Sequence, residues 1–290
     1  PILAQCRKSR FYPVPGPVVY TMIKLPLTLI LLIFCAQQTT LALEQAIPIF
    51  ATSNESNDTD IDHTTWQNFL SETVITTHKS AVNRLNYSLV SPKQALLLAE
   101  YIAQMSRIDP RQYSRKTQFA YWVNSYNALT ISLILEHYPI DSIREIKSGL
   151  FSFGPWGKEV HEVTGFDLSL DDIEHKILRP IWKDSRVHYA VNCASVGCPN
   201  LQPHAFTADN SEKLLNLAAQ QYVNHPRGVA IENGELKISS IYHWYKEDFG
   251  DDINGIVKHL IEHADPPLSE LLKQPFYRYD HAYDWSLNKP

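Results

Sequence analysis

The stretch that most constrains the fold is residues 117–137, which the sequence predicts to be one long helix. It reads Thr-Gln-Phe-Ala-Tyr-Trp-Val-Asn-Ser-Tyr-Asn-Ala-Leu-Thr-Ile-Ser-Leu-Ile-Leu-Glu-His. Its second half carries apolar side chains on nearly every side, and such a helix is stable where other elements cover it all round. We therefore expect a central, buried helix around which the rest of the chain packs.

Two asparagines interrupt this apolar surface. Asn124 and Asn127 are three residues apart, so they share one face of the helix. A buried amide left without a partner costs about 1–3 kcal/mol, so both side chains are expected to form hydrogen bonds. They either anchor neighbouring backbone or line a site.

The rest of the chain changes from helical to strand patterning. Helical spacing of apolar residues predicts helices over residues 66–77 and 92–105, ahead of the central helix. Alternating patterns predict hairpins over residues 158–170 and 228–239. Further helices are expected over residues 169–178, 211–223, 240–249 and 252–263. This order indicates an α+β fold, with N-terminal helices and the central buried helix packed on a mostly antiparallel sheet built from hairpins.

The start of the chain has the pattern of a signal peptide. Met22 and Lys24 precede an apolar run over residues 25–36, and small residues follow it. The run is shorter than the roughly 20 apolar residues that a stable membrane span needs, so no such span is expected. The divisions expected are an extension upstream of the natural start (1–21), a signal peptide (22–42), a disordered polar leader (43–64) and a single domain (65–290).

The balance of charges favours some partners over others. The sequence holds 31 Asp and Glu against 26 Lys and Arg, and four of the basic residues precede residue 43. A protein this acidic is poorly suited to nucleic acid or anionic membrane surfaces, so we expect neither as a partner. Together with the signal peptide, these features predict a secreted protein of the bacterial periplasm.

Residues 186–201 carry the densest group of reactive and turn-forming side chains. They read Arg-Val-His-Tyr-Ala-Val-Asn-Cys-Ala-Ser-Val-Gly-Cys-Pro-Asn-Leu, an apolar run typical of a buried strand that leads into a loop. Cys193 and Cys198 are the only cysteines after the predicted signal peptide. In an oxidising compartment such a pair most simply forms a disulfide.

The alternative makes Cys193 a nucleophile with His188 as its base, in a cysteine hydrolase that acts on amide or peptide bonds. On a continuous strand their odd separation places the two side chains on opposite faces, so a direct pair requires a sharp turn after Val191. Otherwise the base comes from elsewhere, with His161, His204 and His243 as candidates. The order of elements is then loosely like that of papain-like or transglutaminase-like enzymes.

His188 also belongs to a predicted polar network. Arg186 lies on the same face of the predicted strand and suits pairing with an acid such as Glu174 or Asp172. We expect one network beneath the loop that carries Cys193 and Cys198, here called the cysteine loop. The network is formed by Arg186, His188, Asn124, Asn127 and Glu174.

No metal site and no cofactor are expected. Cys193 and Cys198 with a histidine lack the ligand spacing of two to four residues that is typical of zinc sites.

Four motifs occur in the same order in a known family. They are Phe119-Ala-Tyr-Trp-Val-Asn-Ser-Tyr-Asn-Ala-Leu-Thr130, Ser169-Leu-Asp-Asp-Ile-Glu-His-Lys-Ile-Leu-Arg179, Arg186-Val-His-Tyr-Ala-Val-Asn-Cys-Ala-Ser-Val-Gly-Cys-Pro199 and the closing Tyr283-Asp-Trp-Ser-Leu-Asn288. In these motifs the chain resembles the family called domain of unknown function 547, over about residues 110–250 and the tail. The resemblance implies a domain of this family but no settled activity.

These observations favour a binding or scaffolding domain with a polar site around the His188–Cys193 strand end. Its partner would be a peptide, a glycan or another protein. The cysteine hydrolase remains the alternative, and the thiol of Cys193 is the group on which the two hypotheses differ.

Overall fold

The computed structural model describes residues 49–147, 149, 152–276 and 278–290. All of them belong to one compact unit, Gln45–Pro290. The predicted upstream extension and signal peptide lie outside the described residues.

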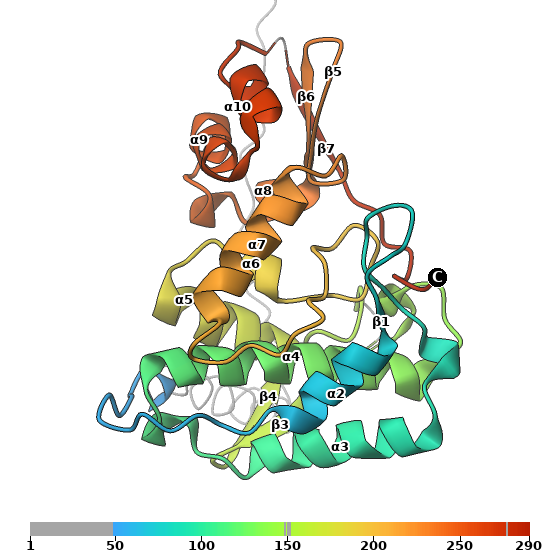
Figure 1. Ribbon diagram of the computed structural model, residues 1–290, viewed down its shortest axis with the longest axis vertical. Coiled ribbons are helices and arrows are strands. Elements are labelled where there is room, and N and C mark those ends of the chain that lie inside the picture. Colours follow the sequence, from blue (N-terminus) through green and yellow to red (C-terminus); the bar gives the residue numbers. More distant parts are fainter. Residues whose placement is uncertain (1–48, 148, 150–151, 277) are drawn as a thin grey trace, which may run out of the picture. The chain divides into compact units, whose positions relative to one another are not determined.

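Helix α4, Arg115–His137, is the central element that the sequence predicts. Ser114 begins it by accepting a hydrogen bond from the backbone N–H of Thr117, and every residue from Thr117 to Ile131 is buried. Figure 1 shows α4 running beside α3, and the two helices pack directly against each other. The prediction of a long, fully covered helix is confirmed.

The two helices before α4 complete this helical layer. Helix α2 spans Thr64–Thr73 and α3 spans Pro92–Ser106. Ser91 and Gln94 form a reciprocal capping box at the start of α3, and Pro92 occupies the first turn, where its missing N–H costs nothing. The short strands β1, Val74–Ile75, and β2, Arg84–Leu85, pair antiparallel between α2 and α3.

Residues 49–63 differ from the disordered leader that the sequence predicts. Phe50 is buried in the main core, where its ring packs against Trp122 with centroids 5.0 Å apart. The backbone of Asn54 bonds to Tyr113, and the backbone N–H of Arg115 bonds to Glu55. A polar stretch with a single well-placed aromatic side chain therefore docks on the domain, although composition alone indicates disorder.

The strands confirm the α+β class and the two predicted hairpins. Strands β3, Glu159–Val163, and β4, Phe166–Ser169, form one antiparallel pair. Strands β5, Val229–Glu232, and β6, Glu235–Ser239, form the other, and β7, Tyr279–Ala282, adds to β6 in parallel. With β1–β2 these make three small sheets in the described part of the chain rather than one, so α4 packs mainly on other helices.

The C-terminal part has a second core of its own. Helices α7, Ser211–Val223, and α9, Ile253–His263, pack together around buried side chains that include Tyr189, Tyr222 and Phe249. Figure 1 shows α9, α10 and strands β5–β7 at the opposite end of the domain from α2–α4. The remaining short helices are η1 Tyr87–Leu89, η2 Pro110–Gln112, η3 Ile143–Glu145, η4 Asp172–Leu178, α5 Arg179–Trp182, α6 Val187–Ala190, α8 Ser240–Trp244, η5 Lys246–Asp248 and α10 Pro266–Leu272.

The predicted strand before the cysteine loop is wrong. Val187–Ala190 forms α6, a single turn of helix with all four side chains buried. A short apolar run fits a buried strand and a buried helix equally well, because neither exposes a polar face that would reveal its period. The strand argument that placed His188 and Cys193 on opposite faces therefore does not apply.

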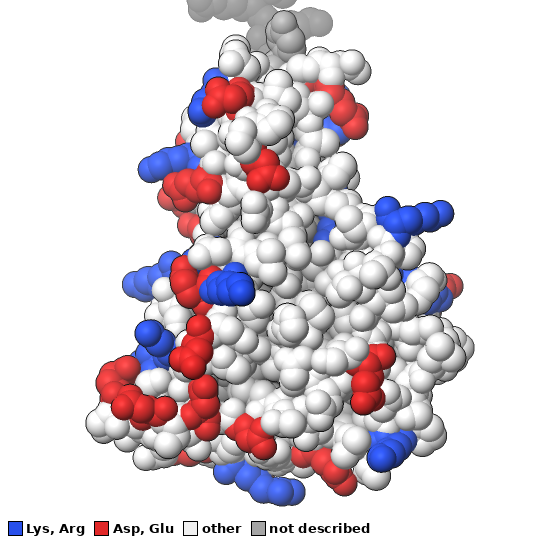
Figure 2. All heavy atoms as spheres, in the orientation of Figure 1, with Lys and Arg blue, Asp and Glu red and all other residues white. Residues whose placement is uncertain are grey.

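Two surface properties complete the description. On the face shown in Figure 2, Lys and Arg side chains alternate with Asp and Glu in small groups between wider uncharged areas. Among the described residues, no helix combines the length and the apolar character needed to cross a bilayer.

Candidate functional site

A cavity of about 520 Å³ opens where the two cores meet. Its floor is polar and includes Glu174 from η4, His188 from α6 and Cys193 from the following loop. Its walls are aromatic: Tyr126, Phe153, Trp156, Trp244, Tyr245, Tyr283 and Trp285. Cavities of this size, mostly apolar with a few converging polar groups, are typical of small-molecule and side-chain binding sites.

His188 lies between two carboxylates. Its Nε2 is 2.6 Å from Oδ2 of Asp248, and its Nδ1 is 3.5 Å from Oε1 of Glu174. The ring stacks on Tyr245 with centroids 4.3 Å apart. Burial opposes a charge on His188, but the hydrogen bonds to Asp248 and Glu174 outweigh it and raise the pKa of His188.

The same contacts that raise the pKa of His188 lower the pKa values of the two carboxylates. Burial alone would raise the pKa of Asp248, yet its hydrogen bonds to His188 and Arg179 lower that pKa to about 2. The Nε of Arg179 lies 2.5 Å from the same Oδ2 atom. Burial likewise opposes the charge of Glu174, and contacts with His188 and His175 bring its pKa below the usual value. Glu174 and His188, which line the cavity, therefore belong to a charged acid–histidine–acid cluster that is completed by Asp248 outside the lining.

Cys193 lies half-buried at the same cavity. Its Sγ is 2.9 Å from the hydroxyl of Tyr283 and 3.4 Å from that of Ser195. Hydrogen bonds from Cys198, Ser195 and Tyr283 lower the pKa of Cys193 against the effect of burial, whereas burial raises the pKa of Cys198. Cys193 is thus the more readily ionised of the two thiols.

The predicted disulfide is absent from the structure. Cys193 and Cys198 are both free, and the backbone N–H of Cys193 donates to Sγ of Cys198 at 3.0 Å. The sulfur of Cys198 thereby helps to close the loop through a hydrogen bond rather than a covalent bond.

The loop around Cys193 is held in one conformation by local bonds. Ala194 has a positive φ of 57°, which is costly for a residue with a Cβ. Asn192 offsets this cost, because its Oδ1 accepts from the N–H of Ala194 and its Nδ2 donates to the carbonyl of Pro199. The rigid turn places the Cys193 thiol at the cavity.

The C-terminal tail is paired with this loop. Ser195 and Leu287 form an isolated antiparallel bridge, and the N–H of Gly197 donates to the carbonyl of Asp284 at 2.8 Å. A Cβ at Gly197 would lie 2.8 Å from the backbone N of Asp284, so only glycine permits this approach. The pairing brings Tyr283 and Trp285 to the cavity.

The two asparagines of α4 anchor backbone rather than line the cavity. Nδ2 of Asn127 donates to the carbonyl of Ala190, and its Oδ1 accepts from the N–H of Asn192. Asn124 binds the backbone of Phe206 in the same two-sided way. Asn127 therefore fixes both ends of the turn between α6 and the cysteine loop.

The five-residue polar network forms only in part. Glu174 and His188 are brought together as predicted, but Arg186 pairs with Asp184 and Glu212, each at 2.7 Å. Asp172, the other acid considered for Arg186, pairs with Lys176 instead. Arg186 directly precedes α6, and residues two apart on a helix lie on different sides. Its side chain therefore points away from that of His188 and pairs with acids outside the network.

The alternative histidines lie elsewhere. None of His161, His204 and His243 is among the residues that line the cavity. His161 contacts Ser106, and His243 stacks against His281.

Sequence reasoning missed two residues of the site, Asp248 and Tyr283. Asp248 follows the second hairpin by a few residues, in a stretch that the sequence predicts as an aromatic-rich helix. Tyr283 belongs to the closing motif of the chain. A local sequence pattern could indicate that these segments are ordered but not that they face His188 and Cys193.

Comparison with known proteins gives a family and no relative of known activity. The family model described as "Protein of unknown function, DUF547" matches residues 110–223. This match supports assignment of the chain to the DUF547 family. No curated protein and no solved structure matches the chain.

The matched DUF547 segment supplies only part of the site. It contains Glu174, His188 and Cys193, while Asp248 and Tyr283 follow it in the sequence. The cavity is therefore completed by α8, the adjacent Tyr245 and the tail, all of which come after the matched residues.

Proposed function

We propose that this DUF547 chain is a binding domain whose ligand occupies the cavity at His188 and Cys193. The observation that carries the proposal is the combination of a cavity of about 520 Å³, aromatic walls and a charged floor that is already organised by hydrogen bonds. A preformed site of this kind binds without first having to order its own side chains.

The residues that line the cavity indicate which chemical groups the ligand carries. The rings of Trp244 and Trp285 stack with centroids 5.6 Å apart, and Trp156 meets Trp285 edge-on at 5.5 Å. Such surfaces suit a flat apolar or ring face, and Glu174 at the floor suits a hydrogen-bond donor. A peptide side chain or a sugar ring provides both.

The three tryptophans make the proposal directly testable. Panels of short peptides and of oligosaccharides are titrated into the protein while tryptophan fluorescence is followed. A ligand of this site changes the emission, and Trp244→Ala, a partly exposed wall residue, weakens its binding by more than tenfold. Tyr279→Ala, at an exposed position that does not line the cavity, is the matched control. Equal binding to both variants would contradict the proposal.

The cysteine hydrolase is the second candidate, and one observation favours it. Cys193 has a lowered pKa and faces the cavity, as a nucleophile must. One observation argues against His188 as the base for Cys193. Both ring nitrogens of His188 face carboxylates, so a protonated His188 has no lone pair with which to accept the thiol proton. Turnover of a peptide or ester substrate that disappears in Cys193→Ala and persists in Cys198→Ala would favour the enzyme over the binding domain.

We also propose that the protein is exported. The pattern of residues 22–42 supports this part of the proposal. Cell fractionation and N-terminal sequencing of the mature protein test it, with a mature start near Leu43 as the expected result. An intact chain recovered from the cytosol would overturn it.

A further inference from the structure

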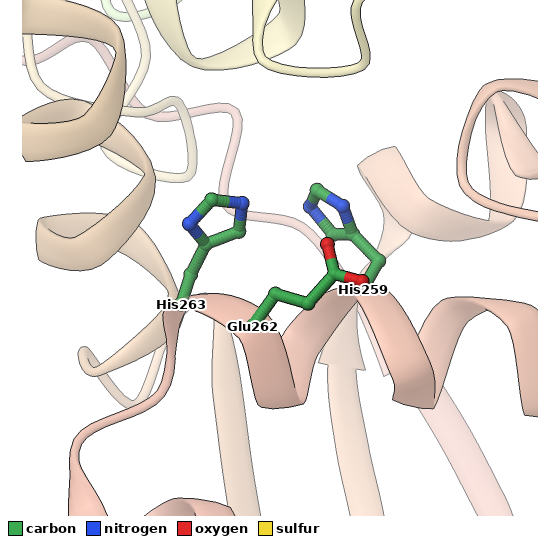
Figure 3. Close-up of side chains that lie close together, drawn as sticks. All are labelled: His259, Glu262 and His263. Carbon is green, nitrogen blue, oxygen red and sulfur yellow. The ribbon is translucent and has the colours of Figure 1, made fainter.

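Three potential metal ligands lie together on α9, away from the cavity. His259, Glu262 and His263 each offer one ligand atom, and these atoms all lie within 4.8 Å of one another. Figure 3 shows the two imidazole rings facing each other with the Glu262 carboxylate beside them. None of the three lines the cavity at Cys193. We propose that they bind a divalent transition-metal ion.

The helix itself brings the ligands together. Residues at i, i+3 and i+4 share one helical face, so His259 presents its ring beside both Glu262 and His263. Two histidines four residues apart on a helix are a frequent arrangement for a metal ion. Donor atoms around a tetrahedral zinc ion lie roughly 3.3 Å apart, a separation that small rotations of the exposed Glu262 and the half-buried His263 can reach.

Neighbouring side chains orient the His259 ring. Its Nδ1 lies 3.4 Å from Oγ of Ser185, and its Nε2 lies 2.7 Å from the hydroxyl of Tyr189. The tautomer in which Nδ1–H donates to Ser185 leaves Nε2 with its lone pair, the state that metal binding requires. A metal ion at Nε2 would displace the Tyr189 hydroxyl, which keeps a partner in Tyr242 at 3.2 Å.

The surrounding charges permit a cation. The charge of Arg186 acts on both histidines, and this guanidinium is bound by Asp184 at 2.7 Å and by Glu212 at 2.7 Å. Its charge is therefore compensated before a metal ion arrives. Glu262 is exposed, so solvent can fill the coordination positions that the helix leaves open.

The donor set selects the class of ion. Two imidazole nitrogens and one carboxylate oxygen suit Zn²⁺, Co²⁺, Ni²⁺ or Cu²⁺, whereas Ca²⁺ and Mg²⁺ prefer oxygen ligands alone. Three protein ligands with open positions are the pattern of a site that can take water or a further ligand.

The test uses the untagged protein after treatment with a chelator. ZnCl₂ is titrated by calorimetry, and CoCl₂ is followed through the visible absorption that Co²⁺ acquires in a nitrogen-containing site. We expect one equivalent of metal to bind. His263→Ala should weaken binding more than tenfold, and Glu262→Gln should weaken it less.

Two control variants decide where the metal binds. His243→Ala removes an exposed histidine outside α9 and should leave binding unchanged. A Cys193→Ser/Cys198→Ser variant should also bind one equivalent. Thermal unfolding confirms that His263→Ala is folded, and His263→Gln repeats the test with a side chain closer in size. No binding by the parent protein, binding unchanged in both His263 variants, or binding lost only in the double cysteine variant would overturn the proposal.

Discussion

His188 and Asp248 are separated by sixty residues and joined by a contact of 2.6 Å. The contact ties α6, at the base of the cysteine loop, to η5, which follows the second hairpin. Arg179 binds the same carboxylate from α5, so three segments of the chain meet at one oxygen atom. The position of His188 at the cavity therefore depends on a residue outside the matched DUF547 segment.

Replacing Asp248 by Asn is expected to destabilise the protein by about 1.5–3 kcal/mol, the usual contribution of a hydrogen bond to a charged group. The loss depends on pH. The pKa of His188 is raised on folding, so its contribution is complete below the unfolded value of about 6.5 and is lost as the pH rises through the folded value. The pKa of Asp248 is lowered to about 2, so its contribution is complete above an unfolded value of about 3.9 and is lost as the pH falls toward 2.

The difference in Tm between the parent protein and Asp248→Asn should therefore be largest between about pH 4 and pH 6.5. Part of it should persist at higher pH, because Arg179 does not titrate there. Asp209→Asn, at an exposed aspartate, is the control and should change Tm little at any of these pH values. A pH-independent difference would show that the charge on His188 contributes nothing.

Asn127 and Asn124 form the same pair of backbone hydrogen bonds at different places, so they can be compared directly. Each Asn→Ala change leaves two buried backbone groups without partners and should cost about 2–5 kcal/mol. Only Asn127→Ala should also accelerate alkylation of Cys193, since Asn127 holds the turn that leads to this residue. The rates are measured by mass spectrometry under conditions where both variants are folded. Equal acceleration in Asn124→Ala would indicate general loosening instead.

The elements that could be predicted from the sequence are those whose structure is determined by a local pattern. Helix α4 and the β5–β6 hairpin are encoded locally, by continuous apolar character and by the Asn233-Gly234 turn, and both were predictable. Helix α6 was not, because its four buried residues expose no polar face. The order of residues 49–63 was also not predicted, because their composition is polar. A single buried ring, that of Phe50, packs this segment on the domain.

The site itself was only half predictable. His188, Glu174 and Cys193 were found because they occur close together in reactive or polar motifs. Asp248 and Tyr283 reach the site through tertiary contacts, one across sixty residues and the other through the pairing of the tail with the cysteine loop. No local period or spacing encodes such contacts.

Phe50 is predicted to anchor the N-terminal segment to the core. Its ring contacts those of Trp122 and Phe166, with centroids 5.0 and 5.8 Å away. Phe50→Ala should lower the free energy of unfolding by about 3–5 kcal/mol, as expected when a fully buried aromatic ring is removed. Denaturant unfolding measures the change, with the exposed Leu89→Ala as the control. A loss of less than about 1 kcal/mol would indicate that residues 49–63 behave as the leader that their composition suggests.

Cys193 should react with iodoacetamide well before Cys198. Its pKa is lowered by hydrogen bonds from Cys198, Ser195 and Tyr283, so the midpoint of its alkylation rate against pH should lie below the usual value of about 8.5. Tyr283→Phe removes the donor 2.9 Å from the sulfur and should move this midpoint to higher pH. Tyr279→Phe, at an exposed position, should leave it unchanged. A midpoint unaffected by Tyr283→Phe, or Cys198 as the first thiol to react, would mean that the Tyr283 hydroxyl does not stabilise the thiolate of Cys193.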